Sequence, residues 1–190
     1  MKLIKKIQDE VFSPIVLDDV RQFQIAHIGA MYKNGQLLSG IVDDILEYSK
    51  SINITIGEDN LKFKYVPVDV DSNLTYFIQN NLYSEFQSGR ICSAQEFIDA
   101  SIDGGDIYDV VLITGIFDKN IYGNSYYDFV KETLNRSYDI SREKIIITFD
   151  MVKNKELNVV YLFAELFTLF PNVKIEKVNS ETLIISIEKK

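Results

Sequence analysis

The sequence predicts an α/β protein in which an open, mixed sheet of seven strands is covered by helices on both faces. Compact apolar segments of strand length alternate with segments whose apolar residues recur at helical spacing over most of the chain. Near the C-terminus this alternation stops, because two apolar segments are separated only by Asn179-Ser180-Glu181. Such a connection is too short for a helical crossover, so the last two strands are expected to pair antiparallel.

The N-terminal part predicts a helix, a strand and a second helix. Residues 1–20 are expected to form a helical extension, because Leu3, Ile7 and Val11 recur at helical spacing before Pro14. Each later element follows from its own pattern: a short apolar run, a glycine-flanked loop, and an i, i+4 apolar stripe. These patterns predict a strand over 23–28, a loop over 29–35 and a helix over 37–46.

In the middle of the chain, Pro67 lies inside an apolar segment and lacks a backbone donor, which makes that strand less regular. Ser72 or Asn73 is expected to cap the next helix, and Gly104-Gly105 ends the one after it. The elements predicted here are strands over 63–68 and 90–92 and helices over 74–86 and 93–101.

The C-terminal half contains the clearest central strand, 109–114, whose four inner residues are all apolar. A loop over 115–124 follows. Apolar periodicity and the stop at Pro171 then predict a helix over 126–134, a strand over 144–149, a helix over 159–170 and the hairpin strands 173–178 and 182–188.

Composition bounds the function. The chain has 190 residues, of which 46% are apolar. It has no apolar run long enough to span a bilayer and no linker-like segment, so we expect one domain over 1–190 and no membrane partner.

The net charge of −8 disfavours a nucleic-acid partner. A single cysteine, Cys92, and a single histidine, His27, weaken disulfide, metal-site and Ser-His-Asp interpretations, and the cytoplasm is the expected compartment.

The order of five β/α units and a terminal hairpin resembles the class I S-adenosylmethionine (SAM)-dependent methyltransferase family, in its small bacterial or phage form. The resemblance extends from Phe23 onward and is best over 109–117, 145–149 and 182–187, which are similar to the family's fourth, fifth and seventh strands. It implies a three-layer Rossmann-like methyltransferase fold and SAM as cofactor, bound over the carboxyl ends of the first strands, where the strand order reverses.

The resemblance implies cofactor contacts at the ends of the first two predicted strands. Gly29 and Gly35 flank the loop whose backbone amides would approach the methionine moiety, and His27 stands where the family usually has an acid. The alternative is an ordinary loop. Asp69, with Asp71 as substitute, would accept hydrogen bonds from the ribose diol. The alternative is that the segment containing Asp71 only caps the next helix.

Two further strand ends complete the implied site. Ser93 or Gln95 would accept a hydrogen bond from the adenine amino group, although capping explains Ser93 equally well. Thr114 and Gly115 leave the central strand and would face the site of methyl transfer. The resemblance therefore implies a pocket assembled from four consecutive strand ends.

Methyl transfer from a sulfonium depends mainly on alignment, and a base is needed only for hydroxyl or carbon acceptors. Candidate bases are Asp118, Asp150 and His27, and no metal is expected. For His27 the alternative is a buried, hydrogen-bonded residue near a strand end. The helix over 159–170 is apolar over much of its circumference, which indicates either deep burial or a homodimer contact.

These observations favour a SAM-dependent methyltransferase acting on a small-molecule or sugar-like acceptor. A non-catalytic binding or assembly protein of the same fold is the alternative, because the glycine loop is irregular and the third strand end lacks an acid. A nicotinamide-dependent oxidoreductase ranks last, since the Gly-x-Gly-x-x-Gly turn is absent.

Overall fold

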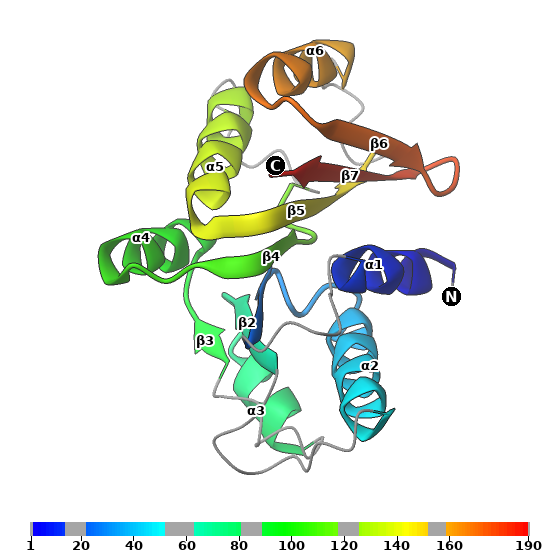
Figure 1. The fold of residues 1–190 in the computed structure, drawn as a ribbon, viewed down its shortest axis with the longest axis vertical. Coiled ribbons are helices and arrows are strands. Elements are labelled where there is room, and N and C mark those ends of the chain that lie inside the picture. The colour runs from blue at the N-terminus through cyan, green and yellow to red at the C-terminus, as the bar shows by residue number, and fades with distance from the viewer. Residues whose placement is uncertain are drawn as a thin grey trace.

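The computed structural model describes residues 2–13, 22–51, 63–80, 89–117, 126–151 and 159–189. Within these ranges it contains one seven-stranded sheet with the strand order β3-β2-β1-β4-β5-β7-β6 (Figure 1). The strands are β1 (Phe23–Ile28), β2 (Phe63–Asp69), β3 (Arg90–Ile91), β4 (Tyr108–Ile113), β5 (Ser141–Asp150), β6 (Val173–Lys177) and β7 (Thr182–Glu188). The helices are α1 (Lys2–Phe12), α2 (Gln36–Ser51), α3 (Asn73–Asn80), α4 (Ala94–Gly104), α5 (Tyr126–Ile140) and α6 (Val159–Leu169).

The predicted fold class is confirmed, including the C-terminal hairpin. Strands β1 to β5 pair parallel wherever they are neighbours, and β7 pairs antiparallel with both β5 and β6. The chain first builds outward from β1 to β3 and then crosses back to β4 on the other side of β1. The strand order therefore reverses between β1 and β4, where such sheets leave a crevice at the carboxyl ends of their strands.

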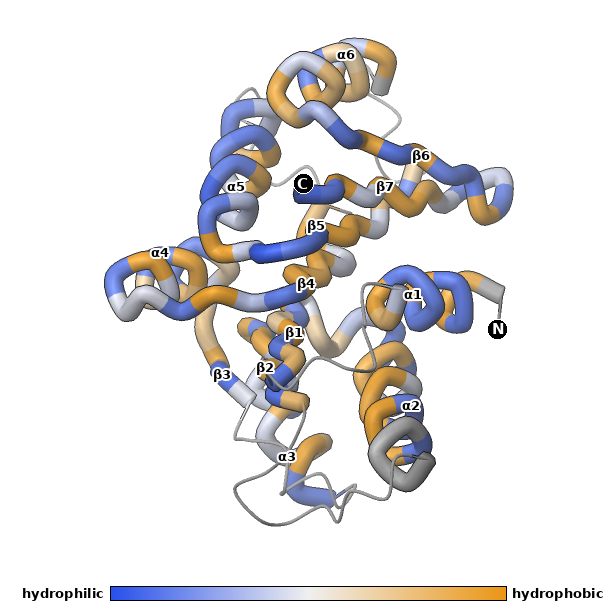
Figure 2. Tube along the Cα trace, viewed as in Figure 1, coloured by the Kyte–Doolittle hydropathy of each residue, from blue (hydrophilic) through white to orange (hydrophobic). Residues whose placement is uncertain are grey.

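Alternation along the strands divides the core into two layers. On β1, Ala26 and Ile28 pack with α4, α5 and α6, whereas Phe23 and Ile25 pack with α1, α2 and α3. Figure 2 shows the apolar side of α2 turned toward the sheet. Because helices cover both faces of the sheet, the central strand β4 is buried along its whole length.

The irregular positions of the sequence have local explanations. Pro67 lies in β2 opposite His27 of β1, and β3 pairs with β2 only at Val68 and Asp69, so no described strand continues beside Pro67 on that side. The α3 cap differs from the prediction, because Asp71 Oδ1 accepts the backbone N–H of Asn73 at 2.9 Å. The Asp71 carboxylate thus caps the start of α3, which agrees with the alternative that the segment containing Asp71 caps this helix.

The N-terminal helix α1 packs against α2 and reaches the sheet through Glu10, which forms an ion pair of 3.0 Å with the buried Lys144 of β5. This contact supports our proposal that 1–190 is one domain. Helix α6 buries Leu162 and Leu166 but exposes other apolar residues, and most of its trace has the hydrophobic colour in Figure 2. No helix within the described ranges has the length and apolarity needed to cross a membrane.

Candidate active site

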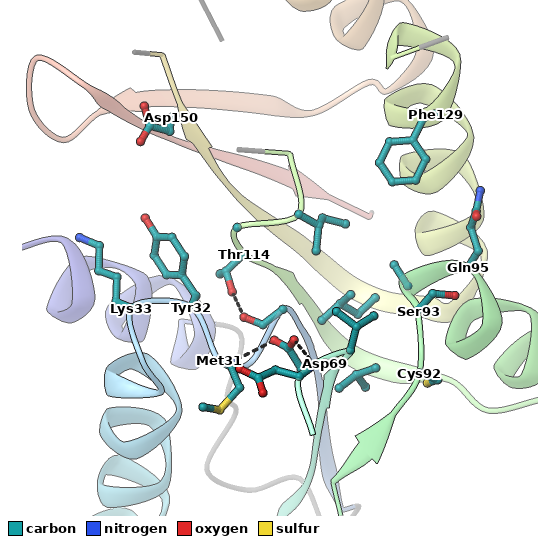
Figure 3. A pocket seen from close by; sticks show the side chains of 18 of the residues that line it. Met31, Tyr32, Lys33, Asp69, Cys92, Ser93, Gln95, Thr114, Phe129 and Asp150 are labelled. Atoms are coloured by element: carbon teal, nitrogen blue, oxygen red, sulfur yellow. Dashed lines mark hydrogen bonds between the residues drawn. The ribbon is translucent and has the colours of Figure 1, made fainter. Parts of the chain in front are cut away.

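A cavity of about 750 Å³ opens at the carboxyl ends of β1, β2 and β4, the point where the strand order reverses (Figure 3). It is lined by residues that follow four parallel strands, by Phe129 of α5 and by the turn between β6 and β7. The lining residues predicted from sequence are Gly29, Asp69, Asp71, Ser93, Gln95, Thr114, Gly115 and Asp150. His27 and Gly35 are not in this lining. Asp118 lies outside the described residues.

Asp69 ends β2 and organises two neighbouring backbone segments. Its Oδ2 accepts the N–H of Met31 at 2.8 Å and its Oδ1 accepts the N–H of Asp71 at 3.0 Å. A carboxylate offers about four acceptor positions. Among the contacts of the described residues, one position therefore remains on each oxygen, which suits the two hydroxyl groups of a vicinal diol.

The loop after β1 uses its first amides internally. The N–H groups of Gly29 and Ala30 both donate to Val68 O, at 2.9 and 3.1 Å, and the N–H of Tyr32 donates to Gly29 O at 3.0 Å. The Met31 amide is taken by Asp69. The structure thus differs from the expectation that the amides beside Gly29 face a ligand.

The two predicted loop glycines have different physical roles. Gly29 has φ +80°, and a Cβ there would lie 1.8 Å from the backbone oxygen of Thr114, so only glycine fits at this wall of the cavity. Gly35 has φ +76° and faces the ring of Phe77 in α3, whose Cζ would lie 2.8 Å from an added Cβ. Gly35 therefore packs the loop against α3, away from the cavity.

His27 is fully buried below the cavity, with both ring nitrogens in contact. Nδ1 lies 2.7 Å from the Tyr65 hydroxyl of β2, and Nε2 lies 2.9 Å from Thr114 Oγ1 after β4. Desolvation lowers the pKa of His27 to about 3, so the ring is neutral at physiological pH. This environment matches the predicted alternative of a buried, hydrogen-bonded residue near a strand end.

Ser93 begins α4 with a complete capping box. Its hydroxyl accepts the N–H of Glu96 at 3.2 Å and donates to Glu96 Oε2 at 2.8 Å, while its own N–H donates to the same carboxylate. The backbone hydrogen bond from Ser93 lowers the pKa of Glu96. The hydroxyl retains one acceptor position, and the neighbouring Gln95 lines the cavity with an exposed side chain.

The wall at the other end of the cavity comes from the C-terminal hairpin. Asp150, the last residue of β5, is aligned with Thr182, the first residue of β7. Because these strands are antiparallel, the β6–β7 turn must lie beside the end of β5. It contributes Asn179 and Glu181 to the lining. Asn179 and Glu181 were not predicted from the sequence, although the antiparallel topology alone brings this turn beside the end of β5.

Two other features were not identified from sequence. Val70 follows Asp69, lines the cavity and is 71% exposed, which is unusual for an apolar side chain at a strand end. Lys33 is the one cationic side chain in the described lining and adopts φ +51°, a strained value for a lysine. Opposite charge comes from the carboxylates Asp69, Asp71, Asp150 and Glu181.

No protein-family model and no curated protein sequence matches the chain. Solved structures match its fold. Human methyltransferase-like protein 13 in complex with S-adenosylhomocysteine (SAH) is 14% identical, with a TM-score of 0.63 over 100% of this chain and 83% of that chain. Magnesium protoporphyrin IX methyltransferase (ChlM) from Synechocystis PCC 6803 with bound SAM is 7% identical, with a TM-score of 0.57 over 100% and 79%.

A ribosomal RNA methylase from Streptococcus thermophilus also matches, with 9% identity and a TM-score of 0.57 over 98% of this chain and 95% of that chain. These likenesses, together with the strand order, show that the chain has a class I SAM-dependent methyltransferase-like fold. At such identities they establish the fold, whereas the site has to be argued from its own residues.

Proposed function

We propose that the chain is a SAM-dependent methyltransferase whose cofactor binds in the cavity at the β1/β4 reversal. The observation that carries the proposal is Asp69, a strand-end carboxylate beside the exposed Val70; within the described residues, each of its oxygens accepts one hydrogen bond and keeps a second acceptor position. The solved neighbours that carry SAM or SAH add support through their shared fold.

The residues present fit the parts of such a ligand. Asp69 would accept the two ribose hydroxyls, and Val70 offers an apolar surface for the face of a purine. Ser93 and Gln95 have acceptor oxygens for an exocyclic amine. A volume of about 750 Å³ lies within the range of small-molecule sites, roughly 300–1,000 Å³.

When bound, SAM supplies a methyl group that is already activated by its sulfonium centre. The chain's own contribution is alignment and exclusion of water. Ile28, Val68, Ile116 and Phe129 give the cavity an apolar wall beside Thr114 and Gly115. Asp150, which lines the cavity, is our choice of base for a hydroxyl acceptor. Asp118 stays a second candidate from the sequence.

We infer a small-molecule or sugar-like acceptor rather than a nucleic acid. The net charge of −8 opposes a polyphosphate chain, and four carboxylates against one ammonium line the described cavity. Two of the solved neighbours differ in this respect, since one is named as a porphyrin methyltransferase and another as an rRNA methylase. Acceptor screening should therefore include RNA as a contrary outcome.

One observation favours a second candidate, a non-catalytic binding or assembly protein of this fold. The amides of residues 29–32 are all donated to groups of the protein itself, which leaves fewer donors for the methionine carboxylate. In this alternative the cavity binds a nucleoside without methyl transfer. We keep the cytoplasm as the proposed compartment and a homodimer through α6 as the proposed assembly.

Isothermal titration of the purified chain with SAM, SAH and NAD tests the proposal. Micromolar binding of SAM or SAH without NAD binding is the expected result. Transfer of radiolabelled methyl from SAM to sugar-like acceptors would then separate enzyme from binding protein. Failure of folded protein to bind either sulfur nucleoside would overturn the proposed cofactor.

A further inference from the structure

His27 is a buried titratable residue that the proposed chemistry leaves unused, and its contacts form a hydrogen-bond chain with one direction. The Thr114 hydroxyl donates to the carbonyl of Gly29 at 2.8 Å, and a carbonyl can only accept. The single hydroxyl proton of Thr114 is therefore committed. Its contact with His27 Nε2 at 2.9 Å must then be a hydrogen bond donated by the imidazole.

The protonation of the ring follows from this step. A neutral imidazole that carries its proton on Nε2 has an acceptor at Nδ1, so the Tyr65 hydroxyl, 2.7 Å away, is the donor there. Every polar atom in this hydrogen-bond chain has a partner, and its three side chains, Tyr65, His27 and Thr114, are at most 2% exposed. The chain ends at the carbonyl of Gly29. Removing one member would leave a buried polar atom without its partner.

This chain connects strand ends to the proposed cofactor site. Tyr65 belongs to β2, His27 to β1, and Thr114 follows β4, so the three strands that meet at the reversal are joined below the cavity. Only its far end, Thr114 and Gly29, reaches the cavity lining. The Gly29 carbonyl also accepts the N–H of Tyr32, a further lining residue.

We propose that His27 is a positioning residue that acts through Thr114 to fix the Gly29 turn on which the cofactor would rest. The inference rests on the proposed function for the identity of the ligand, but the hydrogen bonds themselves do not depend on a ligand. The Tyr65 phenol is the titratable group in described contact with the ring, and its own pKa is raised by burial. Burial lowers the pKa of His27, with no contribution from a charged neighbour. The hydrogen bonds from Tyr65 to His27 and from His27 to Thr114 therefore keep their direction from pH 5 to 8.

The single histidine allows a direct test, because imidazole nitrogen signals of the labelled protein can come only from His27. Nitrogen NMR of the full chain should show one protonated nitrogen, at Nε2, with no titration from pH 5 to 8. SAH should shift this signal although His27 does not line the cavity. Titration in this range, a proton on Nδ1, or a signal indifferent to bound SAH would each overturn the proposal.

Variants separate positioning from a general loss of fold. His27→Leu removes the donor and is expected to weaken SAH binding about tenfold, whereas His27→Gln, whose side-chain amide can donate to Thr114, should stay within about threefold. Tyr161→Phe on the exposed surface of α6 is the control, and circular dichroism checks each fold. Wild-type binding by folded His27→Leu would overturn the inference. Absence of SAH binding by the wild type would instead overturn the proposed function, while the NMR pattern still decides the hydrogen-bond chain.

Discussion

The Oδ2 atom of Asp69 accepts a 2.8 Å hydrogen bond from the backbone N–H of Met31, so the end of β2 is tied to the loop that follows β1. Asp69→Ala should therefore affect both binding and folding. We expect SAH affinity to fall by about 1.5–3 kcal/mol, the range for hydrogen bonds to a charged group, and the melting temperature to fall as well. Titration calorimetry and thermal unfolding measure the two effects.

Asp71→Asn is the matched control, because its amide oxygen can still cap α3 at the N–H of Asn73. Its SAH affinity should remain at the wild-type value. Loss of affinity in Asp71→Asn, with wild-type affinity in folded Asp69→Ala, would transfer the diol contact from Asp69 to Asp71.

Cys92 is the only cysteine of the sequence and lines the cavity, so its alkylation reports on ligand binding. Burial, followed by the Glu96 carboxylate, raises the pKa of the Cys92 thiol above its ordinary value of 9.0. Because the thiolate is the reactive form, alkylation should be slow at pH 7 and accelerate about tenfold per pH unit up to that pKa. Bound SAH should slow the reaction, as mass spectrometry of the modified protein would show.

Glu96→Gln provides an internal check on this pKa. Glutamine can keep the capping box with Ser93 but removes the negative charge beside the thiol. The Cys92 pKa should fall and alkylation at pH 8 should become faster. Equal rates with and without saturating SAH would contradict the placement of the ligand beside Cys92.

The sequence was sufficient for the fold and for residues whose role depends on position along a strand. Asp69, Ser93 and Thr114 were found because the carboxyl ends of parallel strands gather at one edge of the sheet. The Tyr65–His27–Thr114 contacts could not be predicted, since their members are 38 and 87 residues apart in sequence. The hydrogen bonds from the amides of residues 29–32 to other groups of the protein could not be predicted either, because they depend on the backbone conformation rather than on residue type.

Glu10 connects α1 to the sheet through two lysines with very different exposure. Lys144 is buried, whereas the side chain of Lys174 is 61% exposed. Glu10→Ala should lower the free energy of unfolding by about 2–4 kcal/mol, because it leaves a buried ammonium with fewer partners. Lys174→Ala should change it by less than about 0.5 kcal/mol. Urea unfolding measures both values, and equal effects would contradict this assignment.

The ion pairs of Glu10 with Lys144 and Lys174 make the free energy of unfolding depend on pH. Burial alone would raise the pKa of Glu10, but hydrogen bonds from Lys144 and Lys174 lower it below its ordinary value of 4.5. The stabilisation is therefore fully present above pH 4.5 and is lost as the pH falls through the folded-state pKa. In urea unfolding, Glu10→Ala should show a weaker loss of stability with acid than the wild type. Parallel pH profiles would contradict the role of Glu10.

Helix α6 presents Val160 and Phe167 to the surface, 78% and 57% exposed, on the side opposite its buried leucines. Exposed apolar residues on one helix face indicate an association surface. Phe167→Glu should convert the proposed homodimer to a monomer in sedimentation experiments, whereas Thr168→Glu, a change at an exposed polar position of the same helix, should weaken association less. A monomeric wild type at high concentration would reject this assembly.

Three glycines with positive φ differ in the space around them, which separates backbone strain from steric conflict. Gly105 caps α4 with φ +70° and has no atom within 4 Å of an added Cβ, so Gly105→Ala should cost only about 1–2 kcal/mol of conformational energy. Gly115→Ala adds a contact of 3.0 Å with the Tyr32 ring, which can rotate away. Gly29→Ala places its Cβ 1.8 Å from the Thr114 carbonyl oxygen, a backbone atom that cannot move aside in this way.

Thermal unfolding should rank the losses of stability Gly105 < Gly115 < Gly29, and SAH binding should be retained by Gly105→Ala and lost by Gly29→Ala. A Gly29→Ala protein as stable as Gly105→Ala would contradict the close packing between the β1 loop and the end of β4 on which the whole site depends.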